Sequence, residues 1–430
     1  MRIAIIAEVF LPKIDGVVGR TVNLIRQLQA NGDEVIVVCP RVSEPRNSPV
    51  PLIEFPSFPC ASYPEYAIGL PDQRLIRELR EFRPDVVHFL NPFAFGFQCY
   101  DLLCRSDLQL PVLFSFHTLY GEFVKQYSGL GMLSRMLWWL MKSYHNKADR
   151  NLTVSDFMAE DLRKRGFERV ALWPPAVDCS LYNPERKSAA MRSRLSGNHP
   201  ESPLLLTVSR LASEKNVSFL TEVLERVPEA TLAIVGGGPQ REELVRRFSP
   251  YKAHFVGYLR GEELAAAYAS SDAFVYASET ETMGNVILEA MACGLPVIAA
   301  NAGGVTSLVQ HGSDGFLFTP RNAKEASRYV REIIESMKRQ EQMSEAALAS
   351  VQTRTWRNSG DEVRAQYQQV ISEFQLRLPS QIENRQPGTM ATLLTKALVR
   401  LFQLLAPGIT KPAVNMETSR MHQQQAPAFK

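Results

Sequence analysis

The stretch from Ala273 to Ala300, AFVYASETETMGNVILEAMACGLPVIAA, indicates the fold class most clearly. It opens on a short apolar run, Ala273–Tyr276, and closes on another, Val297–Ala300. Between the two runs a loop turns into a helix near Gly284, a residue that lets the backbone adopt tight turns. A strand, a helix and a second strand in this order are typical of a parallel β-α-β unit. The stretch therefore predicts an α/β fold with a parallel sheet.

The same alternation continues along the chain and divides into two series. The strands expected in the first series are Ile3–Ala7, Glu34–Cys39, Val86–Leu90, Val112–Phe116 and Asn151–Val154, and those in the second are Leu204–Val208, Thr231–Val235, His254–Val256, Ala273–Tyr276 and Val297–Ala300. The helices expected between them include Thr21–Ala30, Gln73–Phe82, Ser218–Arg226, Glu242–Arg247 and Glu262–Ala269. Two Rossmann-like domains that face a central cleft are expected, because open α/β sheets bind ligands at the carboxyl ends of their strands.

Breaks in this pattern predict the domain boundaries of the 430-residue chain, which is longer than one core usually serves. We expect an N-terminal domain over residues 1–175, a linker rich in Pro, Ser, Asn and Arg over 176–203, and a C-terminal domain over 204–355. A separate helix is expected over 356–375, and 376–430 would hold a linker, an amphipathic helix and a mobile tail.

Composition excludes several classes of protein. Hydrophobic residues make up 45% of the chain and charged residues 22%, which is ordinary for a globular protein. A formal net charge of +3 is too weak to predict nucleic-acid binding. The six cysteines show no metal-ligand spacing, and the chain contains neither a signal sequence nor an apolar run long enough to span a bilayer. We therefore expect a cytoplasmic protein.

Two pairs of charged residues in the second series are candidates for a binding site. Glu281 and Glu289 are separated by seven residues, and Glu289 would lie about one turn inside the helix that begins near Gly284. A helix N-terminus favours anions, and carboxylates accept hydrogen bonds from sugar hydroxyls. Arg210 and Lys215 follow a strand end, where two cations suit a diphosphate. The alternative for both pairs is solvated surface charge.

The segment Ser278–Gly294 resembles the Glu-x7-Glu motif of the family 4 glycosyltransferases, which have the two-domain GT-B fold. The resemblance implies that Glu281 lies against the transferred sugar and that Glu289 binds the nucleotide ribose. Met283, Gly284 and Asn285, within the same motif, would also contact the donor. The resemblance further implies that the helix from Trp356 crosses back to the first domain.

Further segments match this family in the same order along the chain. They are EVFLPKIDGVVGRT (8–21), SFHTLYG (115–121), VSRLASEKN (208–216), IVGGGPQREEL (234–244) and FVGYLRGEEL (255–264). Gly16 would let the backbone approach the donor, and His117 would contact the donor sugar. Arg210 and Lys215 would contact the phosphates, and the backbone at Tyr258 and Leu259 would border the base. Gly237 departs from the family, which commonly carries Asp there, so the role of that loop is left open.

The resemblance implies a reaction that retains the anomeric configuration. The catalytic residues would be Glu281, His117, Arg210 and Lys215. The chain contains no Asp-x-Asp motif, so neither a metal nor another cofactor is implied. Instead, Arg210, Lys215 and the helix N-terminus after Gly284 would stabilise the leaving diphosphate.

Within the family the likeness is greatest to sulfoquinovosyl diacylglycerol synthases, which implies UDP-sulfoquinovose or another UDP-sugar as donor and diacylglycerol as acceptor. Ala176-Val177-Asp178, where Gly-Val-Asp is usual, and Asn285 depart from that subfamily. A GDP-mannose-dependent α-mannosyltransferase is the nearest alternative. A UDP-sugar epimerase and a non-catalytic subunit of the same fold are the others, and the sequence does not predict an oligomeric state.

Two segments are candidates for contact with an anionic membrane surface, as a lipid acceptor would require. In TMATLLTKALVRLFQLLA (389–406), one helix face would carry apolar residues and another basic ones. The apolar residues are Leu394, Ala397, Leu398, Leu401 and Leu405, and the polar ones are Lys396, Arg400 and Gln403. GLGMLSRMLWWLMKSY (129–144) combines tryptophans with Arg135 and Lys142. For both segments, packing against the protein's own core is the alternative, and the localisation they favour is peripheral, on the cytoplasmic face.

Overall fold

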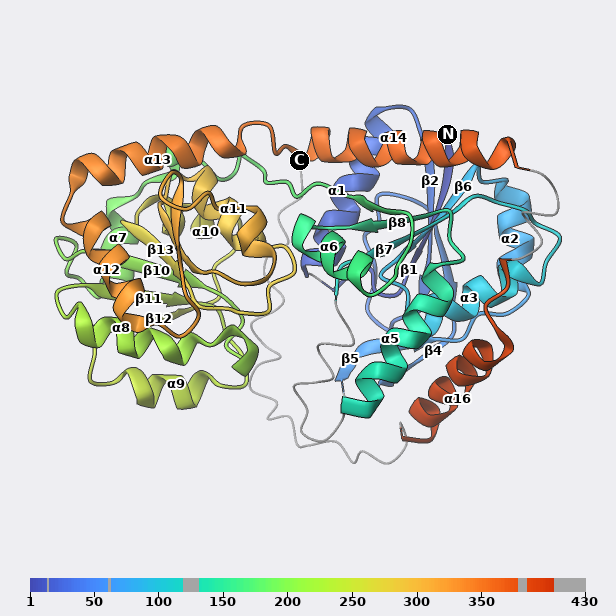
Figure 1. The fold of residues 1–430 in the computed structure, drawn as a ribbon, viewed down its shortest axis with the longest axis horizontal. Helices are drawn as coiled ribbons and strands as arrows, with labels where there is room; N and C mark the ends of the chain where they lie inside the picture. Colours follow the sequence, from blue (N-terminus) through green and yellow to red (C-terminus); the bar gives the residue numbers. More distant parts are fainter. Residues whose placement is uncertain (14, 61–62, 119–130, 378–384, 406–430) are drawn as a thin grey trace.

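The computed structural model describes residues 1–13, 15–60, 63–118, 131–377 and 385–405. The predicted mobile tail after Pro407 lies outside these ranges, as do residues 379–384 of the linker predicted over 379–388. The described chain forms two α/β units side by side, each built around a parallel sheet (Figure 1). Within the described ranges, no helix is long and apolar enough to cross a membrane.

The first sheet has the order β3-β2-β1-β6-β7-β8-β9, with every neighbouring pair parallel. Its strands are β1 (Arg2–Ala7), β2 (Glu34–Pro40), β3 (Leu52–Phe55), β6 (Val86–Leu90), β7 (Val112–Phe116), β8 (Arg150–Thr153) and β9 (Val170–Leu172). A separate antiparallel pair is formed by β4 (Ser57–Cys60) and β5 (Tyr63–Gly69). The helices of this unit are α1 (Gly16–Ala30), α2 (Arg74–Phe82), α3 (Ala94–Cys104), α5 (Gly131–His145) and α6 (Asp156–Lys164).

The second sheet has the order β12-β11-β10-β13-β14-β15 and is also parallel throughout. Its strands are β10 (Leu204–Val208), β11 (Thr231–Val235), β12 (Ala253–Gly257), β13 (Ala273–Tyr276), β14 (Val297–Ala300) and β15 (Gly315–Phe318). Its helices are α7 (Ala189–Leu195), α8 (Leu220–Arg226), α9 (Arg241–Phe248), α10 (Gly261–Ala269), α11 (Asn285–Ala292), α12 (Ala323–Ile334) and α13 (Met337–Val351). Short 3-10 turns occur at η1 (Pro184–Arg186), η2 (Ser213–Lys215), η3 (Val217–Phe219) and η4 (Gly303–Ser307).

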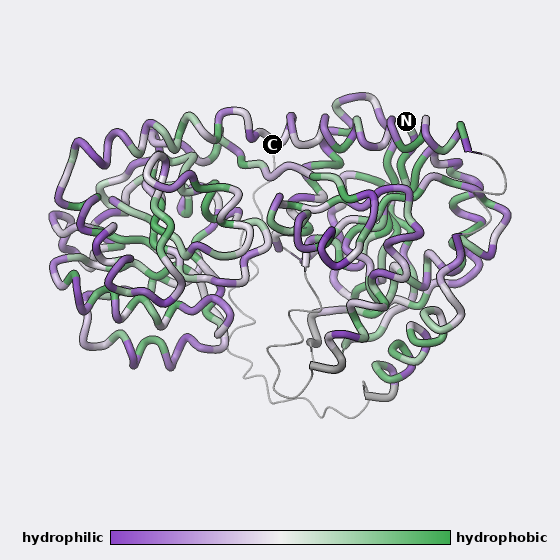
Figure 2. The backbone as a smooth tube through the Cα atoms, in the orientation of Figure 1, coloured by the Kyte–Doolittle hydropathy of each residue, from purple (hydrophilic) through white to green (hydrophobic). Residues whose placement is uncertain are grey.

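Each sheet is buried on both faces, which explains why its strands are continuous apolar runs. In β1, Ile3 and Ile5 pack into the core cluster on one face of the sheet, whereas Ala4 and Ile6 pack into the cluster on the other. This alternation follows from the two-residue repeat of a strand. Figure 2 shows the result as hydrophobic strands inside each unit and hydrophilic segments around them.

Two helices near the C-terminus pack on the first unit. α14 (Trp356–Gln375) runs from the second unit along the first (Figure 1) and packs on α1. There Val363, Tyr367 and Val370 join the cluster that contains Ile3 and Ile5. α16 (Thr389–Leu405) packs against α3, α5 and β4. The first unit therefore contains segments from both ends of the chain.

The structure differs from the sequence-based expectations at the short strands and in α16. β3, β4, β5, β9 and β15 are not among the predicted strands, because runs of three to seven residues are too short to show a clear apolar pattern. In α16 the predicted apolar face is divided: Leu394 and Leu398 pack on the core of the first unit, whereas Ala397 and Leu401 are exposed. The side chain of Leu405 lies outside the described part.

Candidate active site

The order of strands reverses between β1 and β6 in the first sheet and between β10 and β13 in the second. At such a point the loops that follow neighbouring strands leave in opposite directions and open a crevice at the carboxyl edge. In the second sheet, the loop after β10 carries Arg210 and Lys215, and the loop after β13 carries Glu281. The topology therefore explains why residues 66 positions apart can share a site.

Lys215 and Glu281 form the central ion pair of this site. The Nζ atom of Lys215 donates to Oε2 of Glu281 at 2.7 Å, and the hydroxyl of Tyr276 donates to the same oxygen at 2.6 Å. Lys215 Nζ also lies 3.4 Å from the Tyr276 oxygen. One oxygen of the carboxylate is thus held by two donors, and no side-chain hydrogen bond to the other, Oε1, is formed within the described residues.

The charge of Glu281 follows from these contacts. Burial would raise the pKa of its carboxyl, but the charge of Lys215 and the hydrogen bonds from Lys215 and Tyr276 outweigh burial, and the pKa lies below its usual value. Glu281 is therefore ionised at neutral pH, as acceptance of hydrogen bonds from sugar hydroxyls requires.

Glu289 lies in a different environment from Glu281, although the two residues are close in sequence. It sits inside α11, where the hydroxyl of Tyr268 donates to its Oε2 at 2.9 Å. Burial raises the pKa of Glu289 to about 7, against the lowering effect of hydrogen bonds from Tyr268 and Tyr182. The two predicted carboxylates thus have pKa values shifted in opposite directions, lowered at Glu281 and raised at Glu289.

The N-terminus of α11 faces the first unit. Its N-cap, Gly284, has a φ of 87°, a left-handed conformation that favours glycine. Asn285 lies opposite Gly16, where a Cβ atom on the glycine would approach the Asn285 Nδ2 atom to 3.4 Å. The Oδ1 atom of Asn285 is buried without a hydrogen-bond partner in the described chain. The predicted donor residues Gly16, Gly284 and Asn285 are therefore brought together across the two units.

The turn η4 supports the backbone that carries Glu281. The Gly304 nitrogen donates to the Glu281 carbonyl at 2.7 Å. A Cβ atom on Gly303 would lie 2.4 Å from that same carbonyl oxygen, and one on Gly304 would lie 2.2 Å from the Thr282 carbonyl oxygen. Only glycines fit this approach, so η4 fixes the position of the Glu281 loop.

His117, at the end of β7, reaches the same region from the first unit. Its backbone nitrogen donates to Asn91 Oδ1 at 3.0 Å, and its carbonyl accepts from the Thr282 hydroxyl at 3.2 Å. Its ring lies edge-on to Trp173, with centroids 5.1 Å apart. Burial, followed by the charges of Arg20 and His88, lowers the pKa of His117 well below its usual value. His117 is therefore a neutral hydrogen-bonding group beside the loop that carries Glu281.

The remaining predicted residues lie on the periphery of this cluster. Arg210 is exposed and forms no ion pair within the described ranges. Tyr258, 68% exposed, lies against Gly237 of the loop after β11, where a Cβ atom would meet its ring at 2.6 Å. Leu259 packs in the core, which leaves only its backbone to border a ligand. Met283 packs into the core of the first unit.

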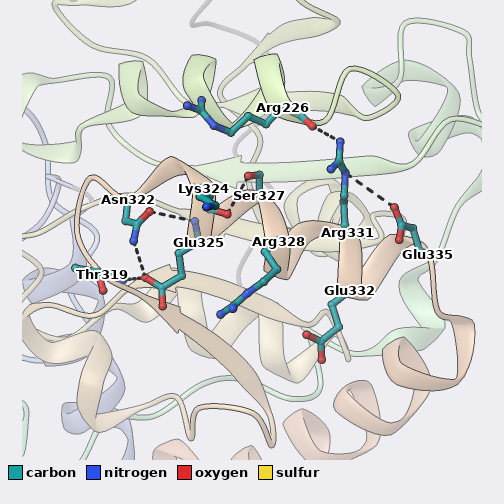
Figure 3. Close-up of a pocket in the computed structure, with 10 residues that line it drawn as sticks. All are labelled: Arg226, Thr319, Asn322, Lys324, Glu325, Ser327, Arg328, Arg331, Glu332 and Glu335. Atoms are coloured by element: carbon teal, nitrogen blue, oxygen red, sulfur yellow. Dashed lines mark hydrogen bonds and ion pairs between the residues drawn. The ribbon is translucent and has the colours of Figure 1, made fainter.

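A hollow on the surface of the second unit lies apart from this site. It is lined by charged residues of α12 together with Arg226 of α8 (Figure 3). Its cations and carboxylates are largely paired with one another or with the backbone, as in the contacts of Arg331 with Glu335 and with the Arg226 carbonyl. We assign no ligand to it.

Sequence reasoning missed four side chains that shape the site: Arg20, Asn91, Tyr268 and Tyr276. Tyr276 and Asn91 could have been found, since they end or follow predicted strands at the carboxyl edge, whereas Tyr268 lies inside α10. Arg20 gave no such signal, because an arginine in an amphipathic helix usually points to solvent.

Comparisons with known proteins identify the relatives of the chain. Residues 14–181 match the family described as Glycosyltransferase Family 4, and residues 193–349 match Glycosyl transferases group 1. A sulfoquinovosyl transferase of Arabidopsis thaliana is 35% identical over 82% of this chain and 70% of its own. A GDP-mannose-dependent α-mannosyltransferase of Corynebacterium glutamicum is 31% identical over 88% of this chain and 91% of its own. An α-monoglucosyldiacylglycerol synthase of Acholeplasma laidlawii is 28% identical over 74% of this chain and 85% of its own.

Solved structures share the arrangement of the two units. Sucrose-phosphate synthase from Thermosynechococcus elongatus superposes with a TM-score of 0.71 at 21% identity, covering 86% of this chain and 99% of that one. The Anabaena protein HepE, in complex with UDP and glucose, superposes with a TM-score of 0.67 at 18% identity, covering 85% and 99% of the two chains. The fold is GT-B, with two Rossmann-like domains, as the sequence predicted.

Proposed function

The chain belongs to the family 4 glycosyltransferases, and from this premise we propose that it transfers a sugar from UDP-sulfoquinovose to diacylglycerol with retention of configuration. The observation that carries the proposal is the contact of Lys215 with Glu281 beside His117 and the N-terminus of α11. This arrangement offers an anion for sugar hydroxyls and cations for a diphosphate at one crevice.

The proposed roles divide the donor among these residues. Glu281 and His117 would bind the sugar and Glu289 the ribose, while Arg210, Lys215 and the backbone at Gly16, Gly284 and Asn285 would bind the diphosphate. Tyr258 and the backbone of Leu259 would border the base. In the reaction the bond from the anomeric carbon to the UDP oxygen breaks and a bond from that carbon to the acceptor oxygen forms. The acceptor's proton passes to the departing UDP, on the face from which it leaves.

Two observations support this choice of donor and acceptor. The Arabidopsis relative is named as a sulfoquinovosyl transferase, and the Acholeplasma relative is a diacylglycerol-modifying enzyme by name. In addition, α5 and α16 pack side by side on the first domain and both carry basic residues with exposed apolar ones. Such a surface suits an anionic membrane, on the cytoplasmic side of which the enzyme would act.

A GDP-mannose-dependent α-mannosyltransferase is the second candidate. The relative from Corynebacterium glutamicum is nearly as similar and is matched over a larger share of its own length. Because the base would contact mainly the backbone at Tyr258 and Leu259, the described side chains do not select uracil over guanine.

The experiment is a transfer assay with purified protein. UDP-sulfoquinovose, UDP-glucose, UDP-glucuronate and GDP-mannose are each incubated with and without diacylglycerol in vesicles, and both nucleotide release and lipid product are measured. Diacylglycerol-dependent release of UDP from UDP-sulfoquinovose supports the proposal. Transfer only from GDP-mannose would replace it with the second candidate. A changed free nucleotide-sugar would indicate an epimerase, and binding without turnover would indicate a non-catalytic protein.

A further inference from the structure

Arg20, on the inner face of α1, is a buried cation without an anionic partner. Its residue is 1% exposed, and within the described ranges it forms no ion pair with a carboxylate. Burial lowers the pKa of its guanidinium to about 9, which still leaves the group protonated at neutral pH. A buried charge is unfavourable unless it is paired or fully hydrogen-bonded. The buried charge of Arg20 therefore calls for a partner that the described part of the chain does not supply.

The hydrogen bonds of Arg20 satisfy one end of its guanidinium only. Nη2 donates to the carbonyl oxygens of Trp173 and Pro174 at 2.5 and 2.8 Å, and the group lies 4.5 Å from the Trp173 ring centroid. Nη1 points to the sulfur of Met283, and a thioether is a weak acceptor. Nε has no partner. Two of the three guanidinium nitrogens thus lack a good acceptor.

The position of Arg20 places these unsatisfied donors beside the proposed sugar. It lies one helical turn after Gly16, on the same face of α1, and Gly16 is opposite Asn285. Met283, which contacts Nη1, is two residues from Glu281 in sequence, and the charge of Arg20 acts on His117. Glu281 is already held by Lys215, so it is not the missing counter-ion.

We propose that Arg20 binds an anionic substituent of the donor sugar, a sulfonate or a carboxylate, and thereby selects charged sugars over neutral ones. This inference rests on the proposed function, since it takes the sugar to lie between Glu281 and His117. Met283 belongs to the second domain, so a change in domain separation can remove its sulfur from Nη1. The anion would then accept from Nη1 and Nε, while Nη2 keeps its carbonyl partners.

The test compares nucleotide and nucleotide-sugar affinities of the full chain and its variants by calorimetry. We measure the affinity of wild type, Arg20→Met and Arg20→Lys for each of four ligands: UDP, UDP-glucose, UDP-glucuronate and UDP-sulfoquinovose. Arg20→Met is expected to weaken the binding of one or both nucleotide-sugars with an anionic sugar by about 10- to 100-fold. Its affinities for UDP and UDP-glucose should stay within about 3-fold of wild type. Arg20→Lys is expected to retain part of the preference, and the glucuronate and sulfoquinovose arms distinguish carboxylate from sulfonate. Arg26→Met, an exposed arginine of the same helix, is the control and should change none of the four affinities.

Three outcomes overturn the inference. A uniform loss for all four ligands, with a lower melting temperature, would mean that Arg20 only ties α1 to Trp173 and Pro174. Unchanged affinities in Arg20→Met would mean that it does not contact the donor. A wild-type preference for UDP-glucose over both anionic sugars would also overturn it. If Arg20→Met does not fold, the affinities of Arg20→Lys and the wild-type preference for charged over neutral sugars still test the inference. The transfer assay keeps the two proposals apart: transfer from UDP-sulfoquinovose with an unchanged preference in Arg20→Met removes this inference alone.

Discussion

Lys215 sets the charge of Glu281, and Glu281 in turn fixes the position of Lys215. Glu281 is buried enough that its carboxyl would tend to hold a proton, and Lys215 prevents this. At the same time, the carboxylate holds Lys215 at the crevice rather than free in solvent. A substitution of Lys215 therefore changes the charge of Glu281, whereas a substitution of Glu281 releases the side chain of Lys215.

Replacing Lys215 by Met is expected to reduce turnover by about 100- to 1000-fold, because a preorganised cation at the departing diphosphate is lost. Without Lys215, burial dominates and the pKa of Glu281 rises, so the remaining activity should fall more at pH 6 than at pH 8. The measurement is kcat against pH for both proteins. Lys252→Met, an exposed lysine of the second domain, should behave as wild type. A near-normal kcat in Lys215→Met would remove the residue from the mechanism.

Glu289 predicts a pH dependence of stability as well as of donor binding. Its pKa is raised from 4.5 to about 7 in the folded protein, so ionisation between these values disfavours the fold by up to about 3 kcal/mol. The unfavourable effect is absent below pH 4.5 and complete above pH 7. Ribose hydroxyls would favour the ionised form, so donor affinity should increase as pH rises through about 7.

Glu289→Gln separates these two effects. The variant should show a smaller decrease in unfolding free energy between pH 5 and 8 than wild type, and weaker donor binding above pH 7. Denaturant unfolding and calorimetry at each pH measure both. If stability in the variant depends on pH as in wild type, Glu289 is not the titrating group.

The turn η4 shows how a helical turn with no chemistry of its own determines the site. Gly304→Ala would place a Cβ atom 2.2 Å from the Thr282 carbonyl oxygen, so the loop that carries Glu281 must move. We expect a loss of kcat of at least about 10-fold, since small displacements of reacting groups are costly to rate. Gly19→Ala, in α1, has no atom within 4 Å of the added carbon and should be active and no less stable. Equal activity of the two variants would contradict the role of η4.

The helices α5 and α16 lead to a prediction about binding to anionic membranes. On α16, Leu393 and Leu401 are 55% and 50% exposed and lie near Lys396 and Arg400, while Trp139 of α5 is 47% exposed. Lys396→Glu with Arg400→Glu should reduce binding to vesicles containing anionic lipid by about 10-fold or more, because each basic residue near such a surface contributes about 1 kcal/mol. Sedimentation with vesicles measures this.

The matched control for that pair is Lys324→Glu with Lys338→Glu, which makes the same charge change on exposed lysines of the second domain. It should bind vesicles like wild type. An equal loss in both double variants would mean that net charge, rather than this surface, determines binding.

Segments that are buried on both faces could be predicted from the sequence more accurately than segments that are partly exposed. β10 and β11 are predicted to the residue because every position in them is buried and all but one threonine in each are apolar. β9, with three half-buried residues, carried no pattern, and in α16 the periodicity indicated an apolar face but not which part of it the protein covers. Within the site, the family motif predicted the residues that meet, Lys215 and Glu281, whereas Arg20 required knowledge of what packs on α1.

Contacts between distant parts of the chain hold the whole molecule together. Thr282 of the second domain donates to the His117 carbonyl of the first, and Ser155 of the first donates to the Thr282 carbonyl. The two domains are thus joined by hydrogen bonds beside the loop that carries Glu281. The first domain in turn depends on the C-terminal segments, since α14 packs on α1 and α16 on α3 and α5.

Asp149 connects these C-terminal segments to the first sheet. Its side chain, 1% exposed, forms ion pairs with Arg377 and with Arg385, and it accepts from the Val112 nitrogen at 2.7 Å. Arg377 ends the segment that follows α14, and Arg385 begins the one that leads to α16. Asp149 therefore binds residues on both sides of the 378–384 segment at one point.

Asp149→Asn keeps the shape of this side chain but leaves two partly buried arginines without their counter-ion. Breaking a buried ion pair by removing one partner typically destabilises by 3–5 kcal/mol, and we expect a decrease in unfolding free energy of about 3 kcal/mol here. We also expect faster proteolytic removal of α16, because the contact that holds Arg385 on the first domain is weakened. Denaturant unfolding and limited proteolysis with mass spectrometry measure the two effects. Arg80→Gln, which breaks the exposed pair with Asp107, should change stability by less than about 1 kcal/mol. If Asp149→Asn behaves like Arg80→Gln, hydrophobic packing of α16 rather than the Asp149 ion pairs holds the C-terminal segment in place.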